Sequence, residues 1–305
     1  MENNSPKRVI VLGIMRSGTS LTAELIRLWG AYAGEKDDLW TSDVTDPRGY
    51  GYMEYIPLQN LNDELLDYNE TVPPLPEELK EKAADPTYRD KALELIQTMD
   101  QRASDSGAVA WVWKDARTVL TLPFWTKILQ DPIYVITVRH PVETTLSAAK
   151  TEEMDDGSIP YSAGLAYWQY CMLSILNFTQ DSPRKLFIAY DQLLSKPVQE
   201  CTRLGHFLDK HCDLPEHEAQ KRIDTMLPQI STKERHYHSQ KSLADMEQAT
   251  REQRMLYNFL RVKTLYPDEA FNVDDFALYP GWKEYLQCMD MVLAMSKAQY
   301  ENNAK

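Results

Sequence analysis

The feature that most constrains the fold is a buried-strand pattern followed at once by a glycine-rich turn and an amphipathic helix. Val9 to Leu12 is an apolar, largely β-branched run without polar alternation, which is typical of a strand covered on both faces of a parallel sheet. Gly13 to Gly18 then forms a turn, and beyond it apolar residues recur on one helical face from Leu21 to Trp29. Strand, turn and helix in this order predict the first unit of a βαβ fold.

The same alternation continues along the chain. Further buried-strand runs lie at 109–112, 133–138 and 185–189, and helical patterns at 87–103, 141–150, 161–178, 197–208, 243–265 and 282–300. The alternation predicts an α/β fold with a P-loop-like parallel sheet flanked by helices and a helical C-terminal extension. Residues 35–55, rich in Asp, Gly and Tyr, are expected to form a long loop over the sheet. We expect one α/β domain over residues 1–240 and a helical appendage packed on it over residues 241–305.

The amino-acid composition restricts which classes of ligand and which cellular compartment suit the chain. Lys and Arg number 33 against 46 Asp and Glu, giving a net charge of -13, which opposes nucleic-acid binding but permits a local basic pocket for one small anion. The four cysteines lie far apart without metal-binding spacing, so we expect neither a disulfide framework nor a metal site, and a reducing compartment. The sequence shows neither the ~18–20 apolar residues of a membrane span nor the cleavage pattern of a signal peptide, so we expect a cytoplasmic protein.

The turn itself predicts an anion site. Gly13 to Ser20 has the glycine spacing of a P-loop, but Thr19 stands where that motif places lysine. Backbone N–H groups and a helix N-terminus still form a cradle for an anion, with the hydroxyls of Thr19 and Ser20 as further donors. Arg16 supplies one positive charge inside the loop. The alternative is an ordinary strand–turn–helix with a chance glycine pair.

A second anion-binding element follows the strand predicted at 133–138. Arg139 lies at the end of that strand, at the edge of the sheet where open α/β folds bind ligands. Pro141 suits the first position of a helix, which places Ser147 about two turns further on. Arg139 and Ser147 are therefore candidates for holding a second phosphate. The alternatives are a structural salt bridge for Arg139 and a small packing residue for Ser147.

With these elements the chain resembles the sulfotransferases that use 3′-phosphoadenosine 5′-phosphosulfate (PAPS). Gly13 to Ser20 is similar to their 5′-phosphosulfate loop, and Arg139 with Ser147 to their Arg-x7-Ser signature for the 3′-phosphate. A further segment similar to the family is Ala189–Leu194 with Pro197. Within the family the chain is most similar to a bacterial branch, which it resembles at Asn60–Leu66 and Trp113–Arg117. The similarity runs from about Val9 to His238, with Ala116 in place of the proline usual in that branch.

The resemblance implies transfer of a sulfonate group from PAPS to a hydroxyl of a small molecule, sugar or lipid, without a metal. The residues that it implies for PAPS binding are Arg16, Ser17, Gly18, Thr19, Ser20, Arg139, Ser147, Tyr190 and Arg235. Arg16 takes the family's catalytic Lys/Arg position and Lys114 a second cation position, and both would stabilise charge during in-line transfer. A basic loop containing Lys233, Arg235 and His236 would close over the 3′-phosphate, unless it is a solvated charged turn.

The proton acceptor is not settled by the resemblance. Cytosolic family members place a histidine where this chain has Ala116, so the candidates are the carboxylates Glu54, Glu35 and Asp115. Glu54 ends a segment similar to one in the bacterial branch, although two extra residues interrupt it. Glu35 lies at about the distance from Arg16 where tyrosylprotein sulfotransferases carry their base. The alternative for each carboxylate is a solvated loop position, and the alternative for Lys114 is a surface lysine.

Other assignments compete with this one. The aromatic residues of the 35–55 region either wall an acceptor pocket or belong to the core; they are Trp40, Tyr50, Tyr52 and Tyr55. A P-loop kinase or NTPase would need the lysine that Thr19 replaces and a strand ending in a magnesium-binding aspartate. The joint presence of four residues opposes a non-catalytic protein that binds adenosine 3′,5′-bisphosphate; they are Arg16, Lys114, Arg139 and Ser147. The oligomeric state is not predicted.

Overall fold

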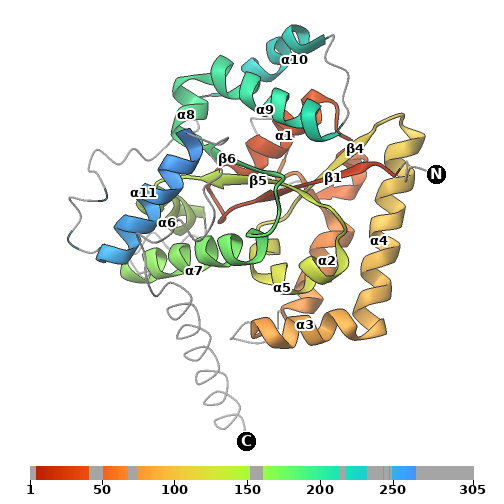
Figure 1. Ribbon diagram of the computed structural model, residues 1–305, viewed down its shortest axis with the longest axis horizontal. Coiled ribbons are helices and arrows are strands. Elements are labelled where there is room, and N and C mark those ends of the chain that lie inside the picture. The colour runs from red at the N-terminus through yellow and green to blue at the C-terminus, as the bar shows by residue number, and fades with distance from the viewer. Residues whose placement is uncertain are drawn as a thin grey trace, which may run out of the picture.

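A parallel four-stranded sheet with helices on both faces forms the centre of the molecule (Figure 1). A computed structural model of the chain describes residues 5–40, 51–67, 74–151, 161–212, 218–231 and 249–265, with residues 243 and 247. The strand order is β4-β1-β5-β6. The strands are β1 Lys7–Leu12, β4 Ala110–Lys114, β5 Ile133–Val138 and β6 Lys185–Ala189. The predicted α/β class with a parallel sheet is confirmed.

The helices fall before, between and after these strands. Those up to β4 are α1 Thr19–Trp29, η1 Lys36–Asp38, α2 Ile56–Leu65, α3 Pro76–Ala84 and α4 Pro86–Asp105. Those between β4 and β6 are α5 Thr118–Ile128, α6 Pro141–Thr151 and α7 Tyr161–Thr179. Those after β6 are α8 Tyr190–Ser195, α9 Pro197–Cys212, α10 Ala219–Met226, η3 Leu227–Gln229 and α11 Arg251–Leu265.

The alternation of side chains along β1 explains why its sequence is apolar throughout. Ile10 and Leu12 pack into the core formed with α2, α3, α4, α5, α7 and α11. Val9 and Val11 point to the opposite face and pack with α1, α8, α9 and α10. Successive residues of a strand face opposite sides of the sheet, so a strand with helices on both faces needs apolar residues at every position.

The strand order creates a crevice at one edge of the sheet. β1 lies between β4 and β5, and the chain crosses from β4 over β1 to reach β5. In open α/β sheets, ligands bind outside the carboxyl ends of the strands at such a reversal of direction. Each of the four strands is followed directly by residues that the sequence singled out as functional.

Residues 35–55 do not form only a loop, as was expected. Leu39–Trp40 forms β2 and pairs antiparallel with Glu54–Tyr55, which forms β3. This short ribbon lies against β4 and carries Glu54 to the carboxyl end of that strand. Tyr55 belongs to the core, whereas Tyr50 lies outside the described residues.

The helical appendage is described only in part. Of the helix expected over 243–265, α11 comprises Arg251–Leu265 and packs against β6 and α7, and the helix expected over 282–300 lies outside the described residues. The domain boundary at residue 240 stays a prediction. Among the described helices, none has the length and apolar character needed to cross a membrane.

The C-terminal end of α1 is held tightly against α9 and α10. Trp29 is fully buried, and its indole N–H donates a hydrogen bond of 2.7 Å to Asp209. A Cβ atom at Gly205 would lie 2.3 Å from the Trp29 ring, so only glycine fits at this contact. The guanidinium of Arg222 covers the ring from 5.5 Å. α1 is therefore fixed at the end opposite to the glycine-rich turn.

Candidate active site

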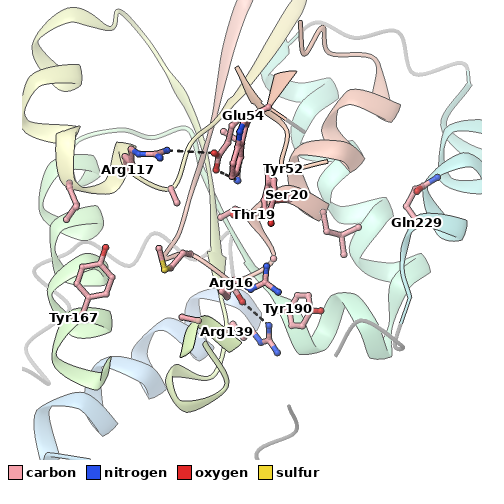
Figure 2. Close-up of a pocket in the computed structure, with 18 of the residues that line it drawn as sticks. Arg16, Thr19, Ser20, Tyr52, Glu54, Arg117, Arg139, Tyr167, Tyr190 and Gln229 are labelled. Atoms are coloured by element: carbon pink, nitrogen blue, oxygen red, sulfur yellow. Dashed lines mark hydrogen bonds and ion pairs between the residues drawn. The ribbon is translucent and has the colours of Figure 1, made fainter. Parts of the chain in front are cut away.

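A cavity of about 540 Å³ opens at the carboxyl ends of the strands. Arg16, Lys114, Arg139 and Tyr190, which follow or end the four parallel strands, all line it. Figure 2 shows Arg16, Arg139 and Tyr190 among the lining residues. Among the described residues that line it, the charged ones are Arg16, Lys114, Arg117 and Arg139, against Glu54. A lining in which the described residues contribute four cations and one carboxylate, in a chain of net charge -13, is suited to an anionic ligand.

The glycine-rich turn forms one wall of the cavity and is braced from within. Ser17 is fully buried, and both its N–H and its hydroxyl bond to the carbonyl of Ile14, at 3.2 and 2.6 Å. The Ser17 hydroxyl also lies 2.7 Å from that of Thr137 on β5. Ser17 was expected to contact the ligand. It is not among the lining residues, and its hydrogen bonds instead hold the turn in shape.

Gly18 allows the tight backbone conformation with which the turn enters α1. It is the N-cap residue with a φ of 96°, and a Cβ atom there would lie 2.5 Å from the ring of Tyr190. Because no side chain caps α1 in the structure, the N–H groups of its first turn are left for another acceptor. Gly18, Thr19 and Ser20 all line the cavity, as expected for an anion cradle.

Arg16 links the turn to α6. Its φ is 63°, in the left-handed region that a non-glycine residue adopts only at a cost of about 1–2 kcal/mol. Its Nε donates to the hydroxyl of Ser147 across 3.1 Å. Its carbonyl oxygen accepts a bond of 2.8 Å from Nη1 of Arg139. Arg16, Arg139 and Ser147, which the sequence places far apart, are thus brought together.

Arg139 is buried with one donor unused. It is 6% exposed, its Nε donates to Glu143 at 3.2 Å, and its guanidinium lies 4.4 Å from the centre of the Tyr190 ring. Its Nη2 is buried and has no hydrogen-bond partner within the described part of the chain. A buried donor without a partner is costly, so Arg139 is arranged for a ligand that supplies an acceptor.

Lys114 and Glu54 form a buried ion pair in the cavity wall. Nζ of Lys114 lies 2.6 Å from Oε1 of Glu54, and their side chains are 4% and 8% exposed. The alternatives of a surface lysine and of a solvated loop carboxylate are therefore wrong for these two residues. Arg117 approaches the other oxygen of Glu54, with Nη1 at 3.8 Å from Oε2 (Figure 2).

Asp115 supports the wall from behind rather than facing the cavity. It is 1% exposed, its Oδ1 accepts from the N–H and Nη1 of Arg117, and its Oδ2 accepts from the amide of Asn62 at 2.7 Å. Asn62 in turn accepts from Thr121 and Trp125, both at 2.8 Å. With both oxygens engaged and no access to the cavity, Asp115 is not suited to accept a substrate's proton.

Arg117 is held by carboxylates on several sides. Burial opposes its charge, but the carboxylates of Asp115, Asp63 and Glu54 outweigh burial and raise the pKa of the Arg117 guanidinium. Its Nε lies 2.6 Å from Asp63. The sequence motif 113–117 contained this arginine, but the motif gave it no role.

Glu35 lies apart from the cavity. It is exposed, is not among the lining residues, and accepts a bond of 3.0 Å from the hydroxyl of Tyr32. Burial and this bond raise the pKa of Tyr32 to about 12. The structure thus separates the two carboxylates proposed as bases: Glu54 lies in the cavity and Glu35 does not.

The remaining lining residues include several to which the sequence analysis gave no role. The rings of Trp40 and Tyr52 stack with 4.6 Å between their centres, and both residues line the cavity. For these two aromatic residues the structure agrees with the alternative that they wall a pocket. Met15 and Leu66, which lie within quoted motifs but were given no role, also line the cavity, as do Leu120 and Ser231, and the lining residues outside every quoted motif include Ala148, Tyr167 and Gln229. Lys233, Arg235 and His236 lie outside the described residues. Among the described residues, no cluster of three or more His, Cys, Asp or Glu side chains is placed to hold a metal ion.

Comparison with known proteins now decides the family. Residues 6–216 match the family model described as the sulfotransferase family. The chain belongs to the sulfotransferase family. This sulfotransferase is an enzyme, and its family membership sets aside the P-loop kinase and non-catalytic alternatives. No curated protein sequence matches it significantly.

Several solved structures resemble this sulfotransferase at low identity. The sulfotransferase domain of the Synechococcus olefin synthase is 17% identical over 86% of this chain and 90% of its own, with a TM-score of 0.44. The sulfotransferase domain from the curacin biosynthetic pathway is 19% identical over 71% and 77%, with a TM-score of 0.41. A Mycobacterium tuberculosis sulfotransferase is 15% identical over 85% and 76%, with a TM-score of 0.38.

Proposed function

We propose that this sulfotransferase takes its sulfonate group from PAPS and transfers it to a hydroxyl group of an acceptor. The observation that carries the proposal is Arg139, whose Nη1 binds the carbonyl of Arg16 while the buried Nη2 has no partner among the described residues. A phosphate next to the glycine-rich turn would satisfy that donor with a charge-assisted hydrogen bond. The residues present therefore fit a donor with two separated anionic groups.

The two anionic ends of the donor would be held by different elements. The N–H groups at the start of α1 and the side chain of Arg16 suit the phosphosulfate end. Arg139 and the Ser147 hydroxyl suit the 3′-phosphate, and Tyr190 supports Arg139 through its ring. By resemblance alone, Arg235 is proposed to cover that phosphate. Ser17 acts indirectly, by holding the turn.

The chemistry requires charge stabilisation more than covalent catalysis. PAPS supplies an activated sulfonate: a bond forms between the acceptor oxygen and sulfur, the bond from sulfur to the bridging phosphate oxygen breaks, and adenosine 3′,5′-bisphosphate leaves. By analogy with phosphoryl transfer, fixed cations lower the barrier by stabilising the charge that moves to the leaving oxygen. Arg16 and Lys114 line the cavity and are the cations assigned to this role.

Glu54 is assigned as the general base. It is the carboxylate among the lining residues that the structure describes, and Lys114 and Arg117 hold its two oxygens in a fixed orientation. In this role Glu54 takes the proton of the acceptor hydroxyl as the oxygen attacks. Lys114 then remains beside a neutral carboxyl group and keeps its charge for the sulfonate oxygens.

The donor is tested by nucleotide selectivity and by isotope transfer. The full chain is passed over immobilised adenosine 3′,5′-bisphosphate and eluted with that nucleotide or with adenosine 5′-monophosphate, and transfer of ³⁵S from labelled PAPS to an extract is measured in parallel. Retention with elution by the bisphosphate alone, together with labelled product, supports the proposal. Equal elution by both nucleotides, or labelled PAPS left intact in every extract fraction, contradicts it.

A further inference from the structure

A helix outside the segment that matches the family model packs over the strands β5 and β6. α11 begins at Arg251, whereas the family match ends at residue 216. It packs against β5, β6 and α7, and its residues Leu256 and Leu260 are fully buried in the core. Figure 1 shows α11, in blue, extending from beside α7 to beside α8. Because this buried face anchors α11 to the sheet, the side chains beside it are held in fixed positions.

Two side chains of α11 reach the residues that follow these strands. Tyr257 and Arg261 lie four positions apart, so they project from the same face of the helix. The ring of Tyr257 meets that of His140 edge to face, with 5.2 Å between their centres. Nη2 of Arg261 donates a bond of 2.9 Å to Oδ2 of Asp191, while its Nη1 donates to Oδ1. His140 comes two residues after β5 and Asp191 two residues after β6, so α11 joins the ends of both strands.

The chain neighbours of these two residues meet inside the cavity. They are Arg139 and Tyr190, and the guanidinium of Arg139 lies 4.4 Å from the centre of the Tyr190 ring. Figure 2 shows the two side chains next to each other. Glu143 and the carbonyl of Arg16 hold the edge of the guanidinium, and the Tyr190 ring supports its face. The position of Tyr190 therefore affects where Arg139 directs its remaining donor.

We propose that Arg261 is a positioning residue for the donor nucleotide. Its two parallel bonds fix the orientation of Asp191 as well as its distance. They hold the start of α8 in place and keep the Tyr190 ring against Arg139, whose Nη2 is then directed at the 3′-phosphate. Arg261 is not among the residues that line the cavity, so it acts through these neighbours rather than by contact. The inference rests on the proposed use of PAPS.

The expected size of the effect follows from the exposure of the ion pair. The side chains of Arg261 and Asp191 are 22% and 36% exposed, and an ion pair of this kind changes an equilibrium by up to about fivefold. Without the pair, the arrangement that binds the nucleotide is populated for a smaller fraction of the time, and the apparent affinity falls by that fraction. The fold itself should survive, because a partly exposed pair contributes little to stability.

Calorimetric titration of the full chain with two nucleotides tests the proposal. Arg261→Ala should weaken adenosine 3′,5′-bisphosphate by about fivefold and adenosine 5′-monophosphate, which lacks the 3′-phosphate, by less than about twofold. Arg251→Ala is the matched control, because it removes the same charge from an exposed position at the start of α11. It should leave both affinities unchanged. Equal weakening of both nucleotides by Arg261→Ala, or weakening of neither, would overturn the proposal.

Asp191→Asn separates positioning from a direct effect of charge. Removing a carboxylate near an anion site would by charge alone strengthen nucleotide binding, whereas loss of the contact with Arg261 should weaken the bisphosphate. The double variant Arg261→Ala/Asp191→Asn should bind no more weakly than Arg261→Ala alone, because both changes break the same contact. Tighter binding by Asp191→Asn, or additive losses in the double variant, would show that Arg261 does not act through Asp191.

The donor and the positioning role fail in different ways. If the wild-type chain binds both nucleotides equally, or binds neither, the use of PAPS is wrong and the role of Arg261 falls with it. If the wild type prefers the bisphosphate and Arg261→Ala keeps the whole of that preference, the donor assignment stands and Arg261 has no positioning role. A preference that drops in Arg261→Ala and in Asp191→Asn, but not in Arg251→Ala, would support both.

Discussion

The ammonium group of Lys114 lies 2.6 Å from a carboxylate oxygen of Glu54, and more than nine-tenths of both side chains is buried. Removing one partner of such a pair leaves an uncompensated charge in the interior, which destabilises a fold by about 3–5 kcal/mol. With the catalytic roles proposed for these two residues, a variant of either one would change both activity and stability, so both must be measured.

Glu54→Gln should lower the turnover of PAPS-dependent transfer by at least about 10²-fold, because the amide cannot take a proton. Glu35→Gln is the matched control, since Glu35 is exposed and outside the cavity. Turnover is measured below the unfolding temperature of each variant, and unfolding is followed by urea titration. If Glu54→Gln kept normal turnover while folded, Glu54 would not be the base.

Arg16→Ala and Arg16→Gly should lose turnover equally, by about 10²–10³-fold, because both remove one charge-stabilising donor. They should differ in stability: alanine at a φ of 63° keeps the left-handed backbone cost that glycine avoids, so the glycine variant should be more stable by about 1 kcal/mol. Single-turnover rates and urea unfolding test the two parts. Equal stability would show that the turn rearranges when Arg16 is lost.

Arg139→Ala should discriminate between nucleotides. Loss of a charged hydrogen bond of about 1.5–3 kcal/mol predicts a roughly 10- to 150-fold weaker affinity for adenosine 3′,5′-bisphosphate, with little change for adenosine 5′-phosphosulfate, which lacks the 3′-phosphate. Arg89→Ala on α4, an exposed position, serves as control. Calorimetric titration of both nucleotides gives the comparison. Equal weakening of both would make Arg139 a structural residue.

Lys185 should make stability depend on pH. Burial, with the nearby charge of Lys263, lowers the pKa of Lys185 from 10.5 to about 8, while its ammonium group bonds to the carbonyls of Thr179 and Gln180. Between these two pH values the unfolded chain still binds a proton that the folded chain has released. The contribution of Lys185 to the free energy of unfolding therefore rises from about pH 8 upward and is lost as the pH falls through 8.

Lys185→Met removes this contribution. Urea unfolding at pH 7, 8, 9 and 10 should show the wild type gaining stability relative to Lys185→Met across that range. Lys221→Met, at a position 75% exposed, should keep a constant difference from the wild type. A constant difference for Lys185→Met as well would mean that its ammonium group titrates normally.

The strands and the gathering of the cations could be predicted because both follow from local patterns. Buried parallel strands are apolar at every position, and carboxyl ends of parallel strands meet at one edge of a sheet. That reasoning places Arg16, Lys114 and Arg139 together without any side-chain contact being known. α5 was missed because Pro123 interrupts its sequence and both of its faces are apolar, which removes the helical period from the pattern.

The choice between Glu54 and Glu35 could not be made in the same way. It depends on β2 pairing with β3, and strands of two residues are too short to show a period. The bond from Asn62 to Asp115 joins residues 53 apart in the sequence and leaves no local signature. Arg117 owes its position to that network, so its place in the cavity became visible only in the fold.

The contacts of Trp29 with Gly205, Asp209 and Arg222 fix the far end of α1, and α1 begins at the glycine-rich turn. α1 has 11 residues and is about 16 Å long, at 1.5 Å per residue. Pivoting such a rod by about 4° at its far end moves its tip by about 1 Å, a misplacement that can cost an enzyme about 10²-fold in rate. Under the proposed role of Arg16, a larger residue at Gly205, whose Cβ would lie 2.3 Å from the Trp29 ring, would misalign the reaction without touching the cavity.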